Sequence, residues 1–198
     1  MAKRAREDIN MKIAGLKVLD LTEHLDVRGS FQEIFSDRFL AQAGLSFFTT
    51  SQINLSISRK NVFRGIHFSK AAQPQHKLVA CLNGYLTDFV LDLRVGSPTY
   101  LELERIPLSA SDRRLIFIPS GCGHGFLAHS ESTTLLYAQS SEYSPSEEFE
   151  LNVKEYFDNL GGVQFKDLVL SDKDREAPTI AELREKGMLP QFEEKSQI

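Results

Sequence analysis

The sequence predicts an all-β protein built as a sandwich or a barrel. Its centre is a series of short apolar or alternating segments at residues 50–57, 78–82, 86–93, 101–108, 115–118, 126–128 and 134–139. Turn-forming residues such as Asn83-Gly84 separate them, and short strands at this spacing are typical of sandwiches and barrels. Neither a nucleotide-binding βαβ pattern nor a glycine-rich phosphate loop interrupts the series.

The composition is that of a globular chain with an ordinary surface. Of its 198 residues, 41% are hydrophobic and 25% are charged, and the formal net charge is -4. Such a balance does not predict a broad basic surface, so we expect no nucleic-acid partner. The sequence has no apolar run of membrane-spanning length and no apolar segment behind its basic N-terminus, so we expect no membrane partner and a cytoplasmic location. Cys81 and Cys122 are predicted to be free, buried thiols.

The part of the chain before this series carries weaker patterns. Residues 16–21 are expected to form a first strand, preceded by a loose or partner-contacting arm. A turn around Gly29 leads to a predicted strand at residues 31–35. Residues 37–43 are predicted to be a short helix because Ser36 and Asp37 offer a cap and Gly44 closes it. A second helix is predicted at residues 179–186, ended by Gly187.

The segment at residues 50–57 alternates strictly between polar and apolar residues. Gln52 and Asn54 fall on one face, and Ile53, Leu55 and Ile57 fall on the other. Because successive side chains of a strand point to opposite faces, one face of this strand is predicted to carry amides.

The stretch Arg64-Gly-Ile-His67-Phe places a histidine between two apolar residues. In an extended strand His67 points away from Ile66 and Phe68, which is the arrangement of a base in a lined pocket. A lone histidine in a strand is more often structural, so this segment alone does not establish a role. Arg64 and Lys77 are nearby cations that can hold an anion.

The stretch Pro119-Ser-Gly-Cys-Gly-His124 is similar to the second half of the cupin signature, in which a glycine-rich turn presents a histidine inside the barrel. A metal centre needs three or more protein ligands, but Ser69 stands where a second histidine should follow His67. We therefore expect a cupin barrel without metal. A nucleophilic mechanism is disfavoured because Gly-x-Ser-x-Gly is absent, and Cys122 beside His124 is more simply interpreted as packing.

Acid–base chemistry fits these residues best. It needs His67 as a base, a carboxylate that orients the imidazole, and a phenol as an acid on the far side of the substrate. Tyr137 lies on an alternating segment that can project into the same barrel, although tyrosines in strands are commonly part of the core.

Eight motifs follow one another between residues 18 and 174. They are Asp26-x-Arg28-Gly, Gln52-x-Asn54, Arg64-Gly-Ile-His67-Phe, Gln75-x-Lys77-Leu-Val, Asp88-x-x-x-Asp92-x-Arg94-x-x-Ser-Pro-Thr99, Pro119-x-Gly-x-x-His124-Gly-Phe, Leu136-Tyr137 and Ser144-Pro145. In order and spacing they resemble the dTDP-4-dehydrorhamnose 3,5-epimerase family, whose members act on nucleotide-linked 4-keto-6-deoxy sugars in deoxysugar biosynthesis.

The resemblance implies a fold and an assembly. The fold would be a cupin-like jelly roll (double-stranded β-helix) with a few short peripheral helices. Residues 1–198 would form a single epimerase domain with its core at about residues 45–145, and the N-terminal arm and C-terminal helix would pack on this core. Family members need no metal or cofactor and are usually homodimers, so we also expect a homodimer, with an N-terminal strand exchanged between protomers.

The resemblance also implies residue roles. His67 would remove the proton alpha to the C4 ketone, and Tyr137 would return a proton on the opposite face. Asp174 would pair with the histidine, with its neighbour Asp172 as an alternative. Lys77 would stabilise the enolate oxygen, as an ammonium group in a dry barrel can. Further substrate contacts would be Arg28, Phe31, Glu33, Gln52, Asn54, Arg64, His124 and Tyr143.

The sequence departs from the family where aromatic residues are usual. The positions are Ser30-Phe31, Phe117 and Glu142-Tyr143. Because these regions contact the base and the sugar edge in the family, a CDP- or GDP-linked substrate and epimerisation at one carbon stay open as alternatives. A nucleotide-sugar 3,4-ketoisomerase and a non-catalytic sugar-binding cupin are further alternatives, and the complete histidine, lysine and tyrosine set argues against the last.

Overall fold

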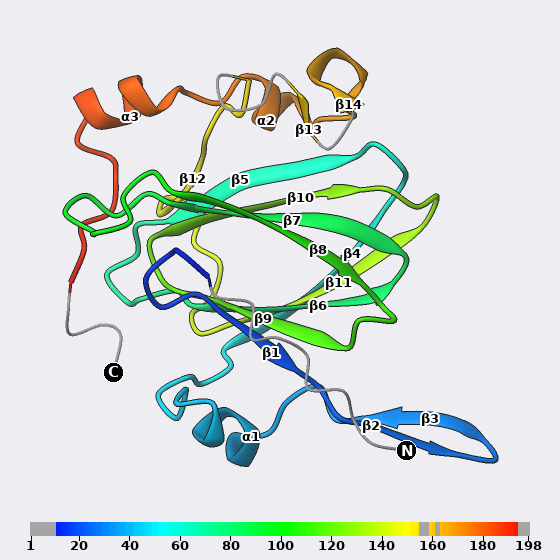
Figure 1. Cartoon of the computed structure of the whole chain (residues 1–198). Helices are drawn as coiled ribbons and strands as arrows, with labels where there is room; N and C mark the ends of the chain where they lie inside the picture. The colour runs from blue at the N-terminus through cyan, green and yellow to red at the C-terminus, as the bar shows by residue number, and fades with distance from the viewer. Residues whose placement is uncertain (1–10, 155–158, 161–162, 194–198) are drawn as a thin grey trace.

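The computed structural model describes residues 11–154, 159–160 and 163–193. Within them, two antiparallel five-stranded sheets lie face to face (Figure 1). The first sheet runs, in spatial order, β1 (Lys17–Asp20), β9 (Arg114–Ile118), β6 (Lys77–Asn83), β11 (Thr133–Gln139) and β4 (Gln52–Ser58). The second runs β12 (Glu148–Glu150), β5 (Phe63–Ser69), β10 (Cys122–Ala128), β7 (Tyr85–Asp92) and β8 (Leu103–Ser109). This arrangement confirms the predicted cupin-like jelly roll.

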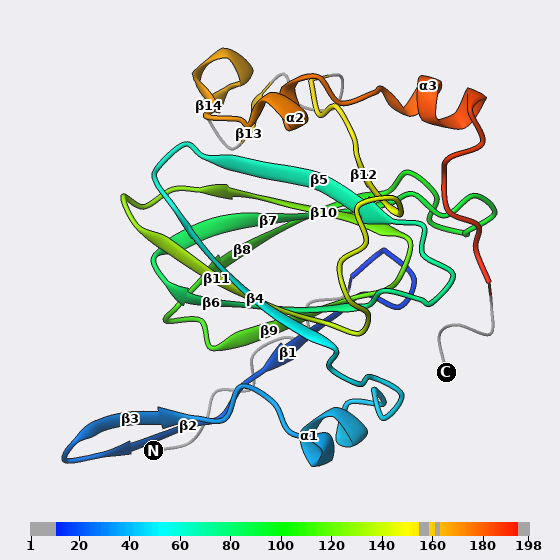
Figure 2. The same ribbon diagram turned by 180° about the vertical axis from the view of Figure 1, so that it is seen from behind.

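Short elements surround the two sheets. They are the hairpins β2 (Glu23–Asp26) with β3 (Gly29–Gln32) and β13 (Asn159–Leu160) with β14 (Val163–Gln164), the 3-10 turn η1 (Phe165–Asp167), and the helices α1 (Asp37–Gln42), α2 (Asp172–Arg175) and α3 (Ile180–Glu185). The hairpin β2–β3 extends away from the body, whereas α2 and α3 lie outside the second sheet (Figures 1 and 2). No helix of the described part is long and apolar enough to cross a membrane.

Three apolar clusters hold the layers together. Phe126 is fully buried between the two sheets, Leu183 of α3 packs on the outside of the second sheet, and Leu40 of α1 packs with residues of the first. Since each sheet is covered on its inner face by the other, the alternating segments of the sequence find a partner surface. The two predicted helices are present. α1 begins at Asp37 as predicted, with Ser36 as its cap, and α3 begins at Ile180, one residue later than predicted, because Thr179 forms a capping box with Glu182.

Two local expectations differ from the structure. The segment at residues 11–15, expected to be part of a loose or partner-contacting arm, is not loose, because Ile13 is buried at 2% exposure; residues 1–10 lie outside the described part. The strand expected at residues 31–35 is instead β3, which begins at Gly29 and pairs with β2. The pairing starts earlier because Gly29 adopts a positive φ of 123° directly after the turn, where an L-residue would be strained.

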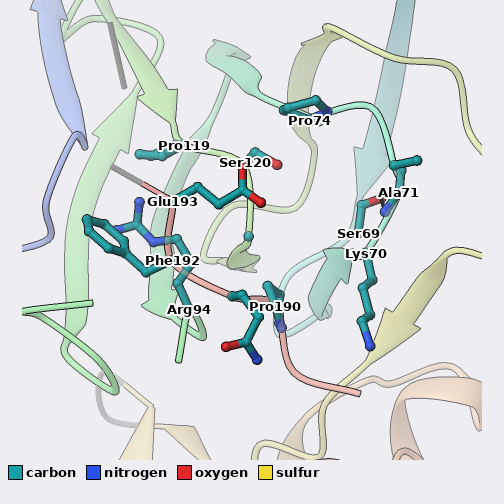
Figure 3. Close-up of a pocket in the computed structure, with 13 residues that line it drawn as sticks. Ser69, Lys70, Ala71, Pro74, Arg94, Pro119, Ser120, Pro190, Phe192 and Glu193 are labelled. Atoms are coloured by element: carbon teal, nitrogen blue, oxygen red, sulfur yellow. Dashed lines mark hydrogen bonds between the residues drawn. The ribbon is translucent and has the colours of Figure 1, made fainter. Parts of the chain in front are cut away.

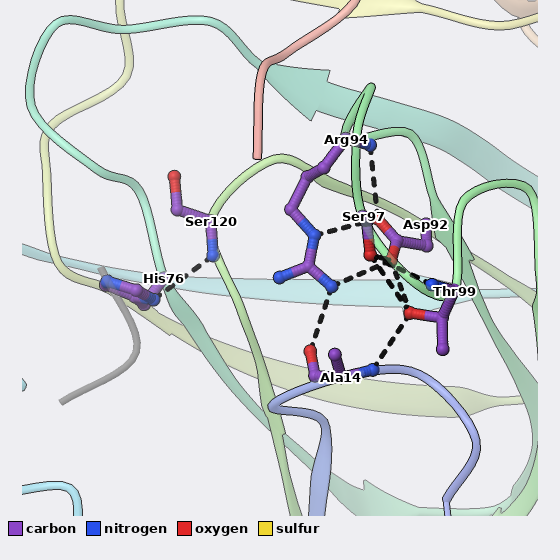
Figure 4. A network of polar contacts seen from close by, with 7 residues as sticks. All are labelled: Ala14, His76, Asp92, Arg94, Ser97, Thr99 and Ser120. Carbon is purple, nitrogen blue, oxygen red and sulfur yellow. Dashed lines mark hydrogen bonds and ion pairs between the residues drawn. The ribbon is translucent and has the colours of Figure 1, made fainter. Parts of the chain in front are cut away.

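Asp92 is the centre of a buried polar network (Figure 4). Its carboxylate accepts hydrogen bonds from the Arg94 guanidinium and from the hydroxyls of Ser97 and Thr99. Arg94 Nη2 also donates to the Ala14 carbonyl at 2.9 Å, and the Ala14 amide donates to Thr99 Oγ1 at 3.1 Å. The motif from Asp92 to Thr99 therefore ties the N-terminal segment to the end of β7.

His76 lies next to this network and is shielded from solvent. Its Nδ1 accepts the backbone N–H of Ser120 at 3.1 Å (Figure 4), and its ring stacks on Phe117 with centroids 5.5 Å apart. Burial, together with the charge of Arg94, lowers the pKa of His76 to about 4. The imidazole is therefore neutral in the folded protein wherever the pH is well above this value.

We expect His76 to make the folded state acid-sensitive. His76 is protonated near pH 6.5 in the unfolded chain but only near pH 4 in the folded chain. The contribution of neutral His76 to the free energy of unfolding is therefore fully present above pH 6.5 and is lost as the pH falls to about 4. The loss should be about 3 kcal/mol in the free energy of unfolding. Urea unfolding across this range should show a smaller loss for His76→Gln, and equal pH slopes in the two proteins would contradict the assignment.

Candidate active site

A cavity of about 320 Å³ opens between the two sheets. The predicted site residues that line it are Asn54, Arg64, His67, Lys77, His124, Tyr137, Tyr143 and Asp174. They come from β4, β6 and β11 of the first sheet, from β5 and β10 of the second, and from α2 and the segment before β12. The structure thus gathers all four predicted catalytic residues at one place.

The other predicted site residues lie elsewhere in the chain. Arg28 belongs to the turn of the β2–β3 hairpin, Phe31 lies on β3, and Glu33 follows it; none of the three lines this cavity. Gln52 stands beside the cavity wall, where its side-chain amide donates to Asn54 Oδ1 at 2.8 Å.

His67 is supported by a carboxylate. Its Nε2 lies 2.6 Å from Asp174 Oδ1, and Asp174 Oδ2 accepts the Ser171 hydroxyl at 2.8 Å. The Ser171 hydroxyl in turn accepts the Asp174 backbone N–H at 3.1 Å and caps α2. Asp174, rather than its neighbour Asp172, is therefore the aspartate that contacts His67.

The charge state of Asp174 fixes the proton on the imidazole. Burial raises the pKa of Asp174, but the hydrogen bond and charge of His67, the Ser171 hydrogen bond and the charge of Arg64 together outweigh it. The net pKa is below the ordinary value, so the carboxyl is ionised at neutral pH. An ionised Asp174 accepts the Nε2–H of the imidazole, so the tautomer that it favours carries its lone pair on Nδ1 of His67.

Tyr137 reaches the cavity from the opposite sheet. Its hydroxyl lies 3.4 Å from Ser56 Oγ, and its ring meets the edge of His124 with centroids 5.7 Å apart. Burial raises the pKa of Tyr137; the Ser56 hydrogen bond and the charge of Arg64 oppose the rise, and the charge of Asp88 adds to it. The phenol is consequently protonated at neutral pH and can serve as an acid.

Two further polar groups complete the walls. His124 Nε2 lies 2.7 Å from Asp88 Oδ2 within the protein interior, and His124 is the direct cross-strand neighbour of His67. Lys77 is 6% exposed; burial lowers its pKa, while the charges of Glu148 and Cys122 oppose the change. A lysine with a lowered pKa is a stronger proton donor than a lysine in water.

His67 and His124 are cross-strand neighbours on two strands that approach closely at two glycines. A Cβ on Gly65 would lie 2.6 Å from Gly125 Cα and 2.6 Å from the His124 carbonyl oxygen. A Cβ on Gly125 would lie 2.8 Å from the Arg64 carbonyl oxygen. Larger residues at either position would push β5 and β10 apart, and with them the imidazoles of His67 and His124.

Several cavity residues were not predicted from the sequence. They are Ser56, Gln139, Glu148, Glu150, Ser171 and Lys173. The alternation Glu148-Phe-Glu150 could have indicated two carboxylates on one face, since β12 pairs with β5 and sets Glu150 opposite His67. Lys173 forms an ion pair with Glu150 across this wall.

The described residues outside this cavity contain fewer groups suited to catalysis or metal binding. Among these residues, no three His, Cys, Asp or Glu side chains gather as a group that could hold a metal ion. A smaller hollow of about 170 Å³ lies beside the C-terminal segment (Figure 3). There the Arg94 guanidinium lies over the Phe192 ring, 5.3 Å from its centroid, and the hollow contains none of the predicted site residues.

Comparison with known proteins gives consistent matches over most of the chain. The family described as dTDP-4-dehydrorhamnose 3,5-epimerase matches residues 10–182. A protein of Mycolicibacterium smegmatis with that name is 36% identical, covering 91% of this chain and 89% of its own length. The structure of the rmlC epimerase of Mycobacterium tuberculosis has a TM-score of 0.84 at 34% identity, covering 95% of this chain and 94% of that one.

A third relative differs in its named reaction. ChmJ, a 3'-monoepimerase from Streptomyces bikiniensis solved in complex with dTDP-quinovose, has a TM-score of 0.83 at 31% identity and covers 91% of both chains. The relatives thus include enzymes named for epimerisation at two carbons and at one.

Proposed function

This chain belongs to the dTDP-4-dehydrorhamnose 3,5-epimerase family, and from that premise we propose that it epimerises a dTDP-linked 4-keto-6-deoxy hexose at C3, at C5 or at both. The observation that supports the proposal is that an imidazole–carboxylate pair and a phenol line one cavity. The His67–Asp174 pair comes from the side of the second sheet, and the Tyr137 phenol comes from the first.

The first step is removal of a proton from carbon. His67 Nδ1 takes the proton alpha to the C4 ketone, and the electron pair of the broken C–H bond forms the enolate. Imidazole is too weak a base for this unless the charge on the enolate oxygen is stabilised as it develops. Lys77 fits that role because it is almost buried and its lowered pKa favours hydrogen bonding to the oxygen.

The second step returns a proton on the other face. The Tyr137 hydroxyl donates its proton to the same carbon, the electron pair of the enolate forms the new C–H bond, and the ketone is restored. Return from His67 instead would regenerate the starting stereochemistry, so inversion requires two groups. Repetition at the second alpha carbon would give the double epimerase.

The remaining cavity groups would bind the substrate. Arg64 and His124 would hold the diphosphate side, Asn54 would contact the sugar, and Tyr143 would contact the nucleotide base. Arginine suits phosphate because its guanidinium can donate two parallel hydrogen bonds.

Proton NMR in deuterium oxide tests this function with dTDP-4-keto-6-deoxyglucose as substrate. Deuterium at C3 and C5 with the rhamno product would establish the double epimerase, and deuterium at C3 alone a 3-epimerase. If dTDP binds but neither carbon exchanges, the epimerase proposal is wrong for this substrate. The same assay with CDP- and GDP-linked sugars distinguishes a different nucleotide from a lack of activity.

We also propose a homodimer in which the β2–β3 hairpin reaches the partner. The hairpin carries exposed Leu25, Val27 and Phe31, the last at 70% exposure. The outer face of β4 is apolar and exposed as well, and β4 is an edge strand of the first sheet. Exchange of the hairpin would cover these surfaces and would bring Arg28, Phe31 and Glu33 to the partner's cavity.

Charging the outer face of β4 should separate the protomers. Leu55 is 58% exposed on that face, and we expect Leu55→Glu to convert a dimer to a monomer in light scattering, with at least a tenfold rise in KM, about 1.4 kcal/mol. Val169→Glu changes an equally exposed apolar residue (55%) outside the sheets and is the control. A monomeric wild-type protein would refute the dimer.

A further inference from the structure

Side-chain amides form an unbroken chain of hydrogen bonds beside the cavity. At one end, Glu148 Oε1 accepts from Gln75 Nε2 at 2.6 Å, and Gln75 Oε1 accepts from Gln139 Nε2 at 3.4 Å. Gln139 Oε1 accepts from Asn54 Nδ2 at 3.0 Å. From there Asn54 Oδ1 accepts from Gln52 Nε2 at 2.8 Å.

The chain ends on backbone. Gln52 Oε1 accepts the Tyr143 backbone N–H at 2.8 Å. We refer to Gln52, Asn54, Gln75 and Gln139 as the amide relay. Its two ends, Tyr143 and Glu148, belong to one segment, which connects β11 to β12 and includes the first residue of β12, and both line the cavity.

The direction of the relay is fixed at both ends. The backbone N–H of Tyr143 can only donate, and at the other end the Glu148 side chain accepts from Gln75. Every side-chain amide of the relay therefore points its NH₂ group toward the Glu148 end and its oxygen toward the backbone N–H of Tyr143. Hydrogen bonds aligned in this way polarise one another, so the relay acts as one unit rather than as separate contacts.

The relay connects an edge strand of the first sheet to an edge strand of the second. Gln52 and Asn54 lie on β4, an edge strand of the first sheet, and Glu148 begins β12, an edge strand of the second. Gln75 and Gln139 are buried at 4% and 8% exposure. Breaking the relay at either of these would leave a buried amide or carboxylate without its partner, which is costly.

We propose that the amide relay positions the connection carrying Tyr143 and Glu148, and so sets the affinity for the nucleotide-linked sugar without taking part in proton transfer. This inference rests on the proposed function. It assigns Gln75 and Gln139 as positioning residues. His67, Asp174 and Tyr137 make none of the relay's hydrogen bonds, so the rate of the chemical step should be insensitive to the relay.

Gln75→Met is the first test because Gln75 does not line the cavity. It keeps the length of the side chain and removes the amide. We expect the Kd for dTDP and the KM for the sugar substrate each to rise about tenfold, with kcat changed by less than about twofold. The Tyr143 backbone amide, three relay members away, should exchange with solvent about tenfold faster by NMR.

Gln139→Met and the double variant test whether the relay acts as a unit. If either substitution disrupts the whole relay, the double variant should weaken dTDP binding no more than the more damaging of the two single substitutions. Gln42→Met replaces an exposed glutamine at the end of α1 and should change none of these values. Thermal unfolding verifies that each variant is folded. If Gln75→Met does not fold, the exchange rate of the Tyr143 backbone amide in Gln139→Met tests the relay instead.

The outcomes separate this inference from the proposed function. Additive losses, or unchanged Tyr143 exchange in the folded variants, would overturn the relay. A fall in kcat with unchanged KM would overturn its assignment as a binding device. If the wild-type protein does not epimerise the sugar, the function fails, but the dTDP Kd and the Tyr143 exchange still decide the relay.

Discussion

His67→Ala is expected to stop the reaction at its first step, lowering kcat by about 10³-fold or more, the upper part of the range for loss of a general base. In the proposed mechanism, the alpha proton then has no acceptor beside Lys77, the group proposed to stabilise the enolate. Deuterium incorporation and product formation should therefore disappear together. The Kd for dTDP should change by less than about threefold, because the base acts on the sugar rather than on the nucleotide.

Proton NMR in deuterium oxide measures both events in one sample. His129→Ala is the matched control, since His129 contacts Thr87 and Tyr85 and does not line the cavity. Persistent exchange at C3 or C5 in His67→Ala, with the protein folded and binding dTDP, would remove His67 from the role of base. In that case its hydrogen bond to Asp174 would be structural.

Tyr137→Phe is expected to separate exchange from inversion. His67 can still remove the proton and return a deuteron to the same face, so exchange with solvent should continue within about tenfold of the wild-type rate. Inversion should fall by about 10²-fold or more, because the acid on the opposite face is gone. The raised pKa of Tyr137 supports this assignment, since the wild-type phenol retains its proton at neutral pH.

The matched control for this variant is Tyr85→Phe. Tyr85 is 43% exposed and stacks on His129 away from the cavity. Equal losses of exchange and inversion in Tyr137→Phe would mean that the phenol is needed before the enolate forms. Full inversion would mean that another group supplies the second proton, and the two-sided mechanism would be wrong as drawn.

The same spectra address the ketoisomerase alternative. That reaction would pass through the same enolate but would move the carbonyl from C4 to C3, which changes the proton shifts at C2 and C5, the carbons beside these two positions. Formation of a 3-keto product would therefore contradict the proposed epimerase activity and support ketoisomerase activity. Binding of dTDP-sugar with no exchange at either carbon would favour the sugar-binding cupin.

Local patterns were the best predictors of this structure. The alternation at β4 correctly separated the amides Gln52 and Asn54 from the exposed apolar face. The capping candidates Ser36 and Asp37 correctly marked where α1 begins, and Gly187 marked the end of α3, because such signals depend only on residues within one turn. The apolar neighbours of His67 are buried while the imidazole faces the cavity, as the strand period required.

Features that depend on distant parts of the chain were missed unless the family resemblance supplied them, as it did for His67 and Asp174. Gln75 and Glu148 are 73 positions apart and meet only because β12 pairs with β5. The burial of Ile13 arises because the N-terminal segment docks beside Arg94 and Thr99, 80 or more positions later. Such contacts leave no periodic signal in the sequence, since neither partner's own neighbours indicate the other.

The pairing of β1 with β9 constrains the order of events during synthesis. Lys17 lies opposite Phe117 and Asp20 opposite Arg114, so the first strand of the chain has no partner until the ninth has been made. Synthesis proceeds at about 5–20 residues per second, so β9 is made on the order of 5–20 s after β1. β1 can therefore take its place in the first sheet only after β9 has been made, and it is unpaired on a newly made chain during that interval.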